Sequence, residues 1–342
     1  MSGLDLVPQA TTPTTRKDYV PANEVRWCPG CGDYSILATF QSVLPELGIP
    51  RENIVVVSGI GCSSRFPYYV DTYGVHSIHG RAPAIASGLA ISRPDLSVFV
   101  VSGDGDALSI GGNHLIHALR RNMNLTILLL NNQIYGLTKG QYSPTSPLGS
   151  ISKSSPFGSP DYPFDPVTLA LGCDATFVAR ALDTDRAGLS SAILAGARHE
   201  GASLIEVYQN CMIFNDGAFA ASKGPDANVL PLVDGEPLVW GEFGLVRNEY
   251  GQLVSARVAE VGIDAIVKHD PHRVDATQAF ALSRLKDSVG ASAPVPMGIF
   301  RDVERPSYEH VLRDQAASAH MDGDPTGHLQ ALLVGPDPWI VK

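Results

Sequence analysis

Short apolar runs alternate with mixed segments through the first two-thirds of the chain. Three of the mixed segments, residues 82–93, 111–122 and 185–200, predict helices. The apolar runs are rich in Val, Ile and Leu, have the length of strands, and cover residues 53–59, 96–103, 125–132, 175–181 and 203–209. Strands that are apolar on both faces are typical of a parallel sheet covered by helices. The pattern therefore predicts an α/β fold with a doubly wound parallel sheet.

The composition divides the chain into three parts. Residues 1–22 contain many Thr and Pro and are expected to form a flexible N-terminal arm. Residues 23–225 hold the alternating pattern and are expected to form the main domain. In residues 226–342 the pattern weakens, and only a hairpin over 241–262 and a helix over 275–289 are indicated. We expect this part to be an extension packed on the main domain.

A long loop is predicted inside the main domain. Residues 142–165 are rich in Ser, Pro and Gly, which favour turns over helices and strands. A loop of this length in a compact domain is usually a functional flap, and a plain surface excursion is the alternative.

Charge and hydropathy narrow the function classes. The net charge is −10 over 342 residues, which argues against nucleic-acid binding, because phosphate recognition needs a basic surface. No apolar run approaches the roughly 18 residues of a membrane helix, and the first residues lack the apolar stretch of a secretory signal. We therefore expect a cytoplasmic protein without a membrane contact. In that reducing compartment, the five cysteines are expected to be thiols or metal ligands, not disulfides.

Polar residues follow two of the apolar runs directly. Gly103, Asp104 and Gly105 follow one, and Asn132 ends the next. Neighbouring parallel strands end at the same edge of a sheet, where ligands bind. The Asp104 carboxylate and the Asn132 amide oxygen are suited to one Mg²⁺ completed by phosphate oxygens. The glycines allow close approach of a phosphate, and the N-terminus of a helix over residues 107–121 favours the anion. Taken singly, each fragment is equally a plain turn.

Together, the two fragments resemble the diphosphate-binding motif of thiamine-diphosphate enzymes, in which GDG is followed at a distance by NN. The resemblance implies that Asp104, Asn132 and the backbone carbonyl of Ile134 hold Mg²⁺. It also implies that Gly105 and Asp106 contact the diphosphate of thiamine diphosphate.

The cysteines allow four interpretations. Cys28 and Cys31 form a C-x-x-C sequence in WCPGCG, which suits a redox dithiol, half of a zinc site, part of an iron–sulfur site, or two unrelated core thiols. Cys62 and Cys211 each follow a predicted strand, so they belong to the same edge of the sheet. Cys173 lies between a predicted helix and a strand and is expected to be a small buried apolar residue.

Six motifs in order make the resemblance specific. They cover parts of residues 27–211 and read WCPGCG, GIGCSSR, HSIHGRAPAIASGLA, GDGDALSIGGNHLIHALRRN, NNQIYGLTKGQ and YQNC. Together they resemble the β subunit of 2-oxoacid:ferredoxin oxidoreductases, most of all the 2-oxoglutarate type. The resemblance implies one [4Fe–4S] cluster on Cys28, Cys31, Cys62 and Cys211. Zinc and dithiol interpretations are disfavoured, because neither uses Cys62 and Cys211. Further cofactor contacts are implied for Ile60, Gly61, Cys62, Ser63, His79, Gly136 and Leu137.

Substrate choice is predicted from two cationic side chains. Arg65 directly follows GCSS, and Lys139 lies in GLTKGQ. We expect both to meet the distal carboxylate of 2-oxoglutarate, which pyruvate lacks. The alternatives are a pyruvate or broad 2-oxo acid enzyme, a non-redox thiamine-diphosphate decarboxylase or carboligase, and a catalytically silent scaffold. Intact Asp104 and Asn132 argue against the last of these.

The resemblance also implies partners. The expected reaction converts 2-oxoglutarate and coenzyme A to succinyl-CoA and CO₂ while ferredoxin is reduced. Only the diphosphate half of a thiamine-diphosphate site is evident, so we expect an α subunit to supply the aminopyrimidine half, in a heterodimer or a dimer of heterodimers. The sequence has no run of closely spaced cysteines of the ferredoxin type, so electrons are expected to leave to a separate ferredoxin.

Overall fold

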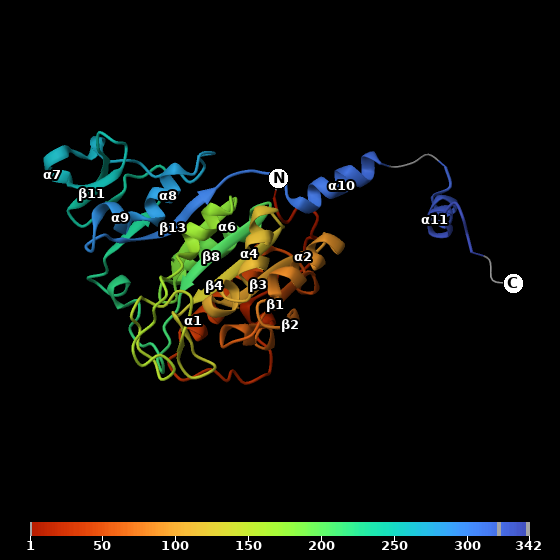
Figure 1. Ribbon diagram of the computed structural model, residues 1–342, viewed down its shortest axis with the longest axis horizontal. Coiled ribbons are helices and arrows are strands. Elements are labelled where there is room, and N and C mark those ends of the chain that lie inside the picture. The colour runs from red at the N-terminus through yellow and green to blue at the C-terminus, as the bar shows by residue number, and fades with distance from the viewer. Residues whose placement is uncertain (1, 320–322, 340–342) are drawn as a thin grey trace.

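The computed structural model describes residues 2–319 and 323–339, and its centre is an eight-stranded sheet in the order β2-β1-β3-β4-β8-β7-β13-β9 (Figure 1). The strands are β1 Ile54–Ser58, β2 Tyr73–His76, β3 Ser97–Gly103, β4 Leu125–Asn131, β7 Phe177–Leu182, β8 Ala202–Tyr208, β9 Val229–Leu232 and β13 Val295–Asp302. From β2 to β7 every neighbouring pair is parallel. β13 runs antiparallel to β7 and parallel to β9. The predicted doubly wound, mostly parallel α/β sheet is therefore confirmed.

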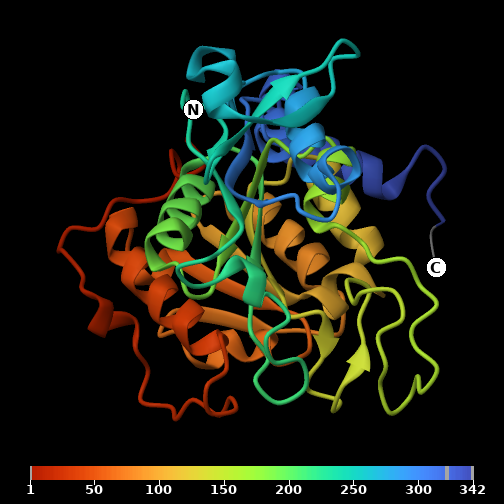
Figure 2. The ribbon, with the colours of Figure 1, turned by 90° about the vertical axis from the view of Figure 1, so that its left-hand side faces the viewer.

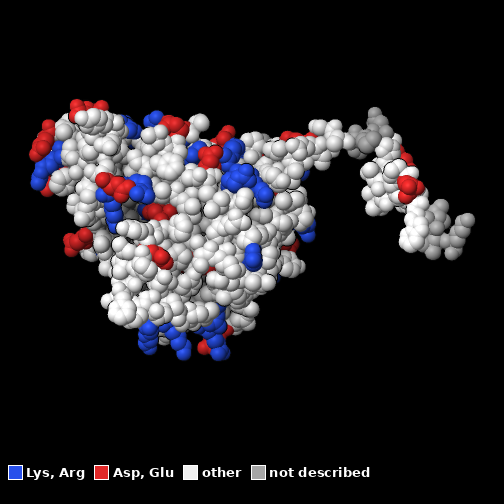
Figure 3. Space-filling model, viewed as in Figure 1, with Lys and Arg blue, Asp and Glu red and all other residues white. Residues whose placement is uncertain are grey.

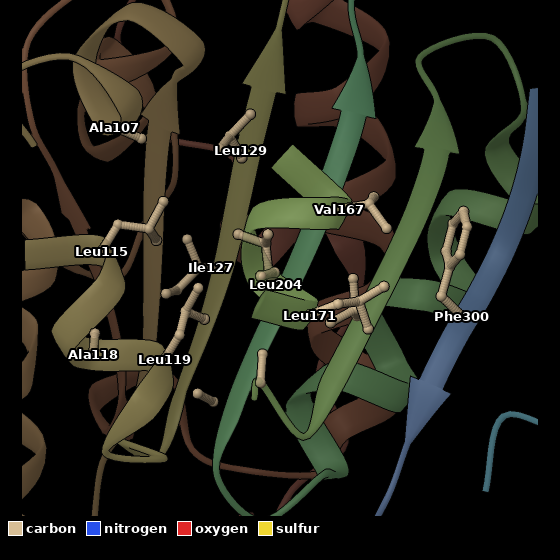
Figure 4. Close-up of a cluster of buried hydrophobic side chains, with 14 of the residues drawn as sticks. Ala107, Leu115, Ala118, Leu119, Ile127, Leu129, Val167, Leu171, Leu204 and Phe300 are labelled. Carbon is tan, nitrogen blue, oxygen red and sulfur yellow. The ribbon is translucent and has the colours of Figure 1, made fainter. Parts of the chain in front are cut away.

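Helices cover both faces of the sheet. On one face lie α1 (Asp33–Val43) and α6 (Arg186–Arg198). The other face is covered by α2 (Ala82–Ser92), α4 (Gly112–Arg120), α5 (Pro166–Gly172) and α8 (Thr277–Ser283). Each face has its own buried apolar cluster. In the cluster on the face covered by α2 and α4, Leu115 and Leu119 of α4 lie against Ile127 of β4 (Figure 4). Buried β1, β4 and β7 have no polar face because both of their sides are covered.

The order of the strands creates a crevice at one edge of the sheet. From β1 the chain continues to β2 on one side, whereas from β3 it continues to β4 on the other side. The segments that leave the carboxyl ends of β1 and β3 therefore diverge. Open α/β sheets bind ligands at such a point.

The helix after β3 begins earlier than the sequence predicts. It begins at Asp104 as the short α3 (Asp104–Leu108) and is interrupted before α4. Gly103 is the N-cap, so both acidic residues of the GDGD sequence lie in the first turn. The N-terminus of α3, and not that of a helix over 107–121, thus faces the crevice.

The other strands and α-helices lie outside this layered core or at its edge. They are the hairpin β5 (Ile134–Tyr135) and β6 (Gln141–Tyr142), the small sheet β10 (Val239–Trp240), β11 (Phe243–Arg247) and β12 (Leu253–Arg257), and the helices α7 (Val258–Val261), α9 (Leu285–Val289), α10 (Tyr308–Ser318) and α11 (Pro325–Val334). After β6, residues 143–165 contain only one isolated bridge, between Ser152 and Ser155, as expected for the long loop.

Both terminal parts contact the main body, and the sequence predicts a flexible arm for the first and an extension packed on the main domain for the second. Leu4, Val7 and Tyr19 are buried in the apolar cluster on the α1 face, so the described residues 2–22 are anchored to the main body. β9 and β13 extend the central sheet. The predicted hairpin is β11 and β12, which lies beyond one end of the sheet (Figure 2). The predicted helix over 275–289 is divided into α8 and α9.

Charged residues form no continuous basic surface on the face drawn in Figure 3. There, Lys and Arg lie near Asp and Glu along the upper part, several Lys and Arg lie at the lower edge, and a broad central area carries few charges. This distribution agrees with the negative net charge of −10. In the part of the chain that the structure describes, no helix combines the length and apolar character needed to cross a membrane.

Candidate cofactor and iron–sulfur site

A cavity of about 500 Å³ lies at the crevice between the ends of β1, β3 and β4. This volume is in the range of small-molecule sites. The lining residues are 60–63 after β1, 79 before α2, 103–106 at the start of α3, and 132, 134–138 and 141 around the β5–β6 hairpin. Every residue implied to contact thiamine diphosphate or Mg²⁺ is among them. The structure thus brings together residues that lie up to 81 positions apart in the sequence.

Asp104 is a buried carboxylate with only neutral partners for its Oδ2 atom. Its side chain is 2% exposed. Oδ2 accepts hydrogen bonds from Ser143 Oγ at 2.5 Å and Thr145 Oγ1 at 2.6 Å. Burial raises the pKa of Asp104, and the two hydroxyl donors oppose that rise. A divalent cation at the cavity would offset the cost of burying the charge, and carboxylate oxygen is a ligand that Mg²⁺ prefers. The site therefore fits the metal that the motif implies.

The two asparagines at the end of β4, Asn131 and Asn132, have different roles. Asn131 is 2% exposed, and its Nδ2 donates to Glu206 Oε1 at 2.7 Å. Thr145 Oγ1 lies 2.9 Å from Asn131 Oδ1, which connects this residue to the partners of Asp104. Asn132 lines the cavity, and its Oδ1 accepts the N–H of Ile134 at 3.1 Å. Asn131 anchors the turn, whereas Asn132 presents its amide at the cavity.

Asp106 connects the loops around the cavity. Oδ1 accepts the backbone N–H groups of Ile60 at 3.1 Å and Gly80 at 2.7 Å, and it lies 2.7 Å from His79 Nδ1. Oδ2 accepts the Ser102 hydroxyl at 2.6 Å. Asp106 therefore holds the loops that carry Ile60 and His79 in place. Its predicted contact with a diphosphate remains a prediction.

Gly105 allows a tyrosine to form part of the cavity wall. A Cβ atom at Gly105 would lie 2.2 Å from the ring of Tyr135. The Tyr135 hydroxyl donates to the carbonyl of Gly105 at 3.0 Å. Sequence reasoning did not single out Tyr135, although it lies inside the matched NNQIYGLTKGQ segment.

We expect Gly105→Ala to displace the Tyr135 ring. Overpacking of this kind costs about 1–3 kcal/mol of unfolding free energy, and the moved ring should lower affinity for thiamine diphosphate. Thermal unfolding and cofactor titration measure the two effects. Gly112→Ala is the matched control, because a Cβ there meets nothing within 4 Å. Equal results for the two variants would contradict the role of Gly105.

Four of the five cysteines lie on one side of this cavity. Cys28 and Cys31 precede α1, Cys62 follows β1, and Cys211 follows β8. The sulfur atoms of Cys211 and Cys62 lie 3.5 Å and 3.6 Å from the position that a Cβ on Gly136 would take. The missing side chain at Gly136 therefore leaves space between the cavity and these thiols. Cys62 itself lines the cavity.

The electrostatics show that these thiols lie close together. Burial raises the pKa of Cys62 to about 12, and charges on Asp33, Cys211 and Cys28 add to the effect. Burial and Asp33 also raise the pKa of Cys31. Asp33 is itself buried, which raises its pKa to about 7. Thiolates that are buried near a carboxyl group need positive charge nearby to be stable, and the iron of a cluster would supply it.

These cysteines are candidate ligands for an iron–sulfur cluster. Within residues 2–319 and 323–339, no three or more His, Cys, Asp or Glu side chains surround one metal position. In a [4Fe–4S] cluster each thiolate binds a different iron, so the sulfurs surround a volume and do not converge on a point. Cys173 is separate, since it packs on the apolar cluster of the α2 face, whereas Cys31 and Cys62 pack on that of the α1 face.

Arg65 and Lys139 do not line the cavity. Arg65 lies in a short 3₁₀-helix, Ser63–Tyr68, and its guanidinium donates to the carbonyl of Arg26 at 3.3 Å. Lys139 is exposed, in a turn with a φ of 76°. The polar side chains that line the cavity near them are Thr138 and Gln141, which sequence reasoning missed.

Comparisons with known proteins agree with this geometry. Residues 59–207 match the family described as thiamine pyrophosphate enzyme, C-terminal TPP binding domain. The 2-oxoglutarate oxidoreductase subunit KorB of Mycobacterium tuberculosis is 57% identical over 342 residues, covering 98% of this chain and 91% of that relative. The 2-oxoglutarate synthase subunit KorB of Archaeoglobus fulgidus is 45% identical over 185 residues, 54% of this chain and 69% of the relative.

A solved structure supports the same grouping. The 2-oxoglutarate:ferredoxin oxidoreductase from Magnetococcus marinus, with 2-oxoglutarate, coenzyme A and succinyl-CoA bound, contains a chain that superposes with a TM-score of 0.76 at 31% identity. The match covers 95% of this chain and 99% of that chain. The protein belongs to the family of 2-oxoacid:ferredoxin oxidoreductase β subunits.

Proposed function

We propose that this chain is the catalytic β subunit of a 2-oxoglutarate:ferredoxin oxidoreductase. The substrate loses its 1-carboxylate as CO₂, and its acyl carbon forms a thioester with coenzyme A. Two electrons pass one at a time through a [4Fe–4S] cluster to ferredoxin, and one proton is released. The observation that carries the proposal is the position of Cys62, which lines the cavity beside Gly136 and lies among the other thiols.

The residues of this chain hold and orient the cofactors. Asp104, Asn132 and the carbonyl of Ile134 would hold Mg²⁺, and the backbone at Gly105 would approach the diphosphate. Thiamine diphosphate, when bound, supplies the nucleophile for the 2-oxo carbon and the electron sink for decarboxylation. Because Cys62 belongs to both the cavity wall and the thiol group, it would connect a bound cofactor to a cluster.

An α subunit would complete the cavity. Among the described residues that line it, the only acids are Asp104 and Asp106, and no glutamate is present to face an aminopyrimidine ring. Exposed apolar side chains stand at its edge, with Ile60 at 38% and Leu137 at 51% exposure. A partner chain that covered these residues would exclude water and supply the second half of the site.

Lys139 is the better candidate of the two cations for contact with the distal carboxylate. Its neighbour Thr138 lines the cavity, whereas the Arg65 guanidinium is bound to the carbonyl of Arg26. We expect Lys139→Ala to raise KM for 2-oxoglutarate about 10-fold or more, the loss of one charge-assisted hydrogen bond, with a smaller change for pyruvate. Arg65→Ala is the paired variant, and we expect it to change the substrate preference less.

Steady-state viologen reduction tests both the proposal and this prediction. The assay uses the complex with the α subunit, with coenzyme A and either 2-oxoglutarate or pyruvate. The ratio of the two kcat/KM values reports the substrate preference. A wild-type preference for pyruvate would overturn the 2-oxoglutarate assignment. Equal losses for both acids in Lys139→Ala would assign Lys139 to a group that the two substrates share.

A further inference from the structure

Gln209 connects the cofactor cavity to the cysteines. It is 1% exposed and lies between the end of β8 and Cys211. Its backbone N–H donates to the carbonyl of Asn131 at 2.9 Å, next to the proposed Mg²⁺ ligand Asn132. Its side-chain Nε2 lies 3.2 Å from Cys31 Sγ and 2.6 Å from the carbonyl oxygen of Asn210.

The contacts of the Gln209 side chain fix the orientation of its amide. The carbonyl of Asn210 can only accept a hydrogen bond, so the NH₂ group must face it. Reversing the amide would place two oxygens 2.6 Å apart. The NH₂ group has a second hydrogen, and Cys31 Sγ is its other neighbour. Among the described residues, Oε1 has no partner that would favour the reverse orientation.

This N–H···S contact differs from the other polar contacts of the cysteines. Trp27 Nε1 donates to the backbone carbonyl of Cys62 at 2.7 Å, not to its sulfur. In the part of the chain that the structure describes, Gln209 is the residue whose side-chain donor reaches a cysteine sulfur. Burial raises the pKa of Cys31, and the negative charge of the nearby Asp33 carboxyl raises it further. A hydrogen-bond donor at the sulfur has the opposite effect, because it stabilises the thiolate.

We propose that Gln209 is a positioning residue that raises the reduction potential of the cluster by donating a hydrogen bond to the Cys31 thiolate. This inference rests on the proposed function, which supplies the cluster. Reduction adds negative charge that is shared with the ligand sulfurs, so a donor stabilises the reduced form more than the oxidised one. The donor is buried, which strengthens its effect. Gln209 thereby eases the transfer of each electron into the cluster.

The test is a redox titration monitored by electron paramagnetic resonance on the complex with the α subunit. Gln209→Met keeps the length of the side chain and removes the donor. In this variant, the reduction potential of the cluster should shift to a more negative value. At the wild-type midpoint, the ratio of reduced to oxidised cluster should fall roughly threefold to tenfold, where tenfold is 59 mV for one electron. Trp27→Phe is the control, because it removes a nearby N–H that does not reach sulfur, and its shift should be smaller.

A second readout is the nitrogen hyperfine coupling of the cluster, compared between the wild type and the same two variants. With the side-chain amide of glutamine labelled with ¹⁵N, the reduced wild-type cluster should show a weak nitrogen hyperfine coupling, retained in Trp27→Phe and lost in Gln209→Met. An intact cluster with no such coupling in the wild type overturns the inference, as does an unchanged or more positive potential in Gln209→Met. Absence of a cluster from the wild-type protein would instead overturn the proposed function, so the two failures are distinct.

Discussion

Replacing Asp104 with alanine should abolish retention of Mg²⁺ and thiamine diphosphate while leaving the fold intact. The carboxylate is the one charged oxygen ligand proposed for the cation, and without it the diphosphate charges lose their screening. Loss of a buried charged partner costs on the order of 2–5 kcal/mol, which is roughly 30-fold to several thousand-fold in affinity. The fold should persist, because the partners of Asp104 Oδ2 are the hydroxyls of Ser143 and Thr145, which water can satisfy.

Isothermal titration with thiamine diphosphate and Mg²⁺, together with circular dichroism, measures these two outcomes. Asp95→Ala is the matched control. Asp95 does not line the cavity, and its carboxylate lies 2.7 Å from the guanidinium of Arg93. It should leave cofactor affinity unchanged. Undiminished affinity in Asp104→Ala would show that the GDG and NN sequences do not form a metal site here.

Replacing any one of Cys28, Cys31, Cys62 or Cys211 with serine should lose or degrade the cluster and with it the electron transfer to ferredoxin. A [4Fe–4S] cluster needs four thiolate ligands. A serine at one position is a poorer ligand, because its hydroxyl loses its proton to bind iron much less readily than a thiol does. Absorption of the anaerobically purified complex measures the cluster. Binding of thiamine diphosphate should be less affected than the cluster for Cys28 and Cys31, because only Cys62 of the four lines the cavity.

Cys173→Ser is the internal control. Cys173 packs on the apolar cluster of the opposite face of the sheet, and burial raises its pKa. The variant should keep the cluster and lose at most a modest part of the unfolding free energy. If Cys173→Ser bleached the cluster and Cys211→Ser did not, the assignment of the ligands would be wrong.

The strands that the sequence reveals are those buried on both faces. β1, β4 and β7 are buried at every residue, which produces the continuous apolar runs that predict them. β2 is exposed at every residue. β9 is apolar but only four residues long, alternates in burial and contains Pro231, which weakens a strand prediction. Pairing at the edges of the sheet is a property of the assembled fold, and no local pattern in these segments encodes it.

The residues proposed to hold the cofactors could be named from the sequence because they occupy short motifs at strand ends, and the structure places them around one cavity. Ser143 and Thr145 were not, since they lie in a loop rich in Ser and Pro whose contact with Asp104 spans 39 and 41 residues. Arg65 is predicted to contact the substrate from its sequence neighbours alone, and that contact remains a prediction. It follows Ser63, which lines the cavity, but the 3₁₀ turn directs its side chain toward Arg26.

The central claim is that one chain holds both thiamine diphosphate and a [4Fe–4S] cluster. The most direct measurement is the content of iron, acid-labile sulfide and thiamine in the complex after anaerobic purification with its α subunit. The account predicts about four irons, about four sulfides and about one thiamine diphosphate for each copy of this chain. Thiamine diphosphate without iron, or zinc in place of iron, would contradict it.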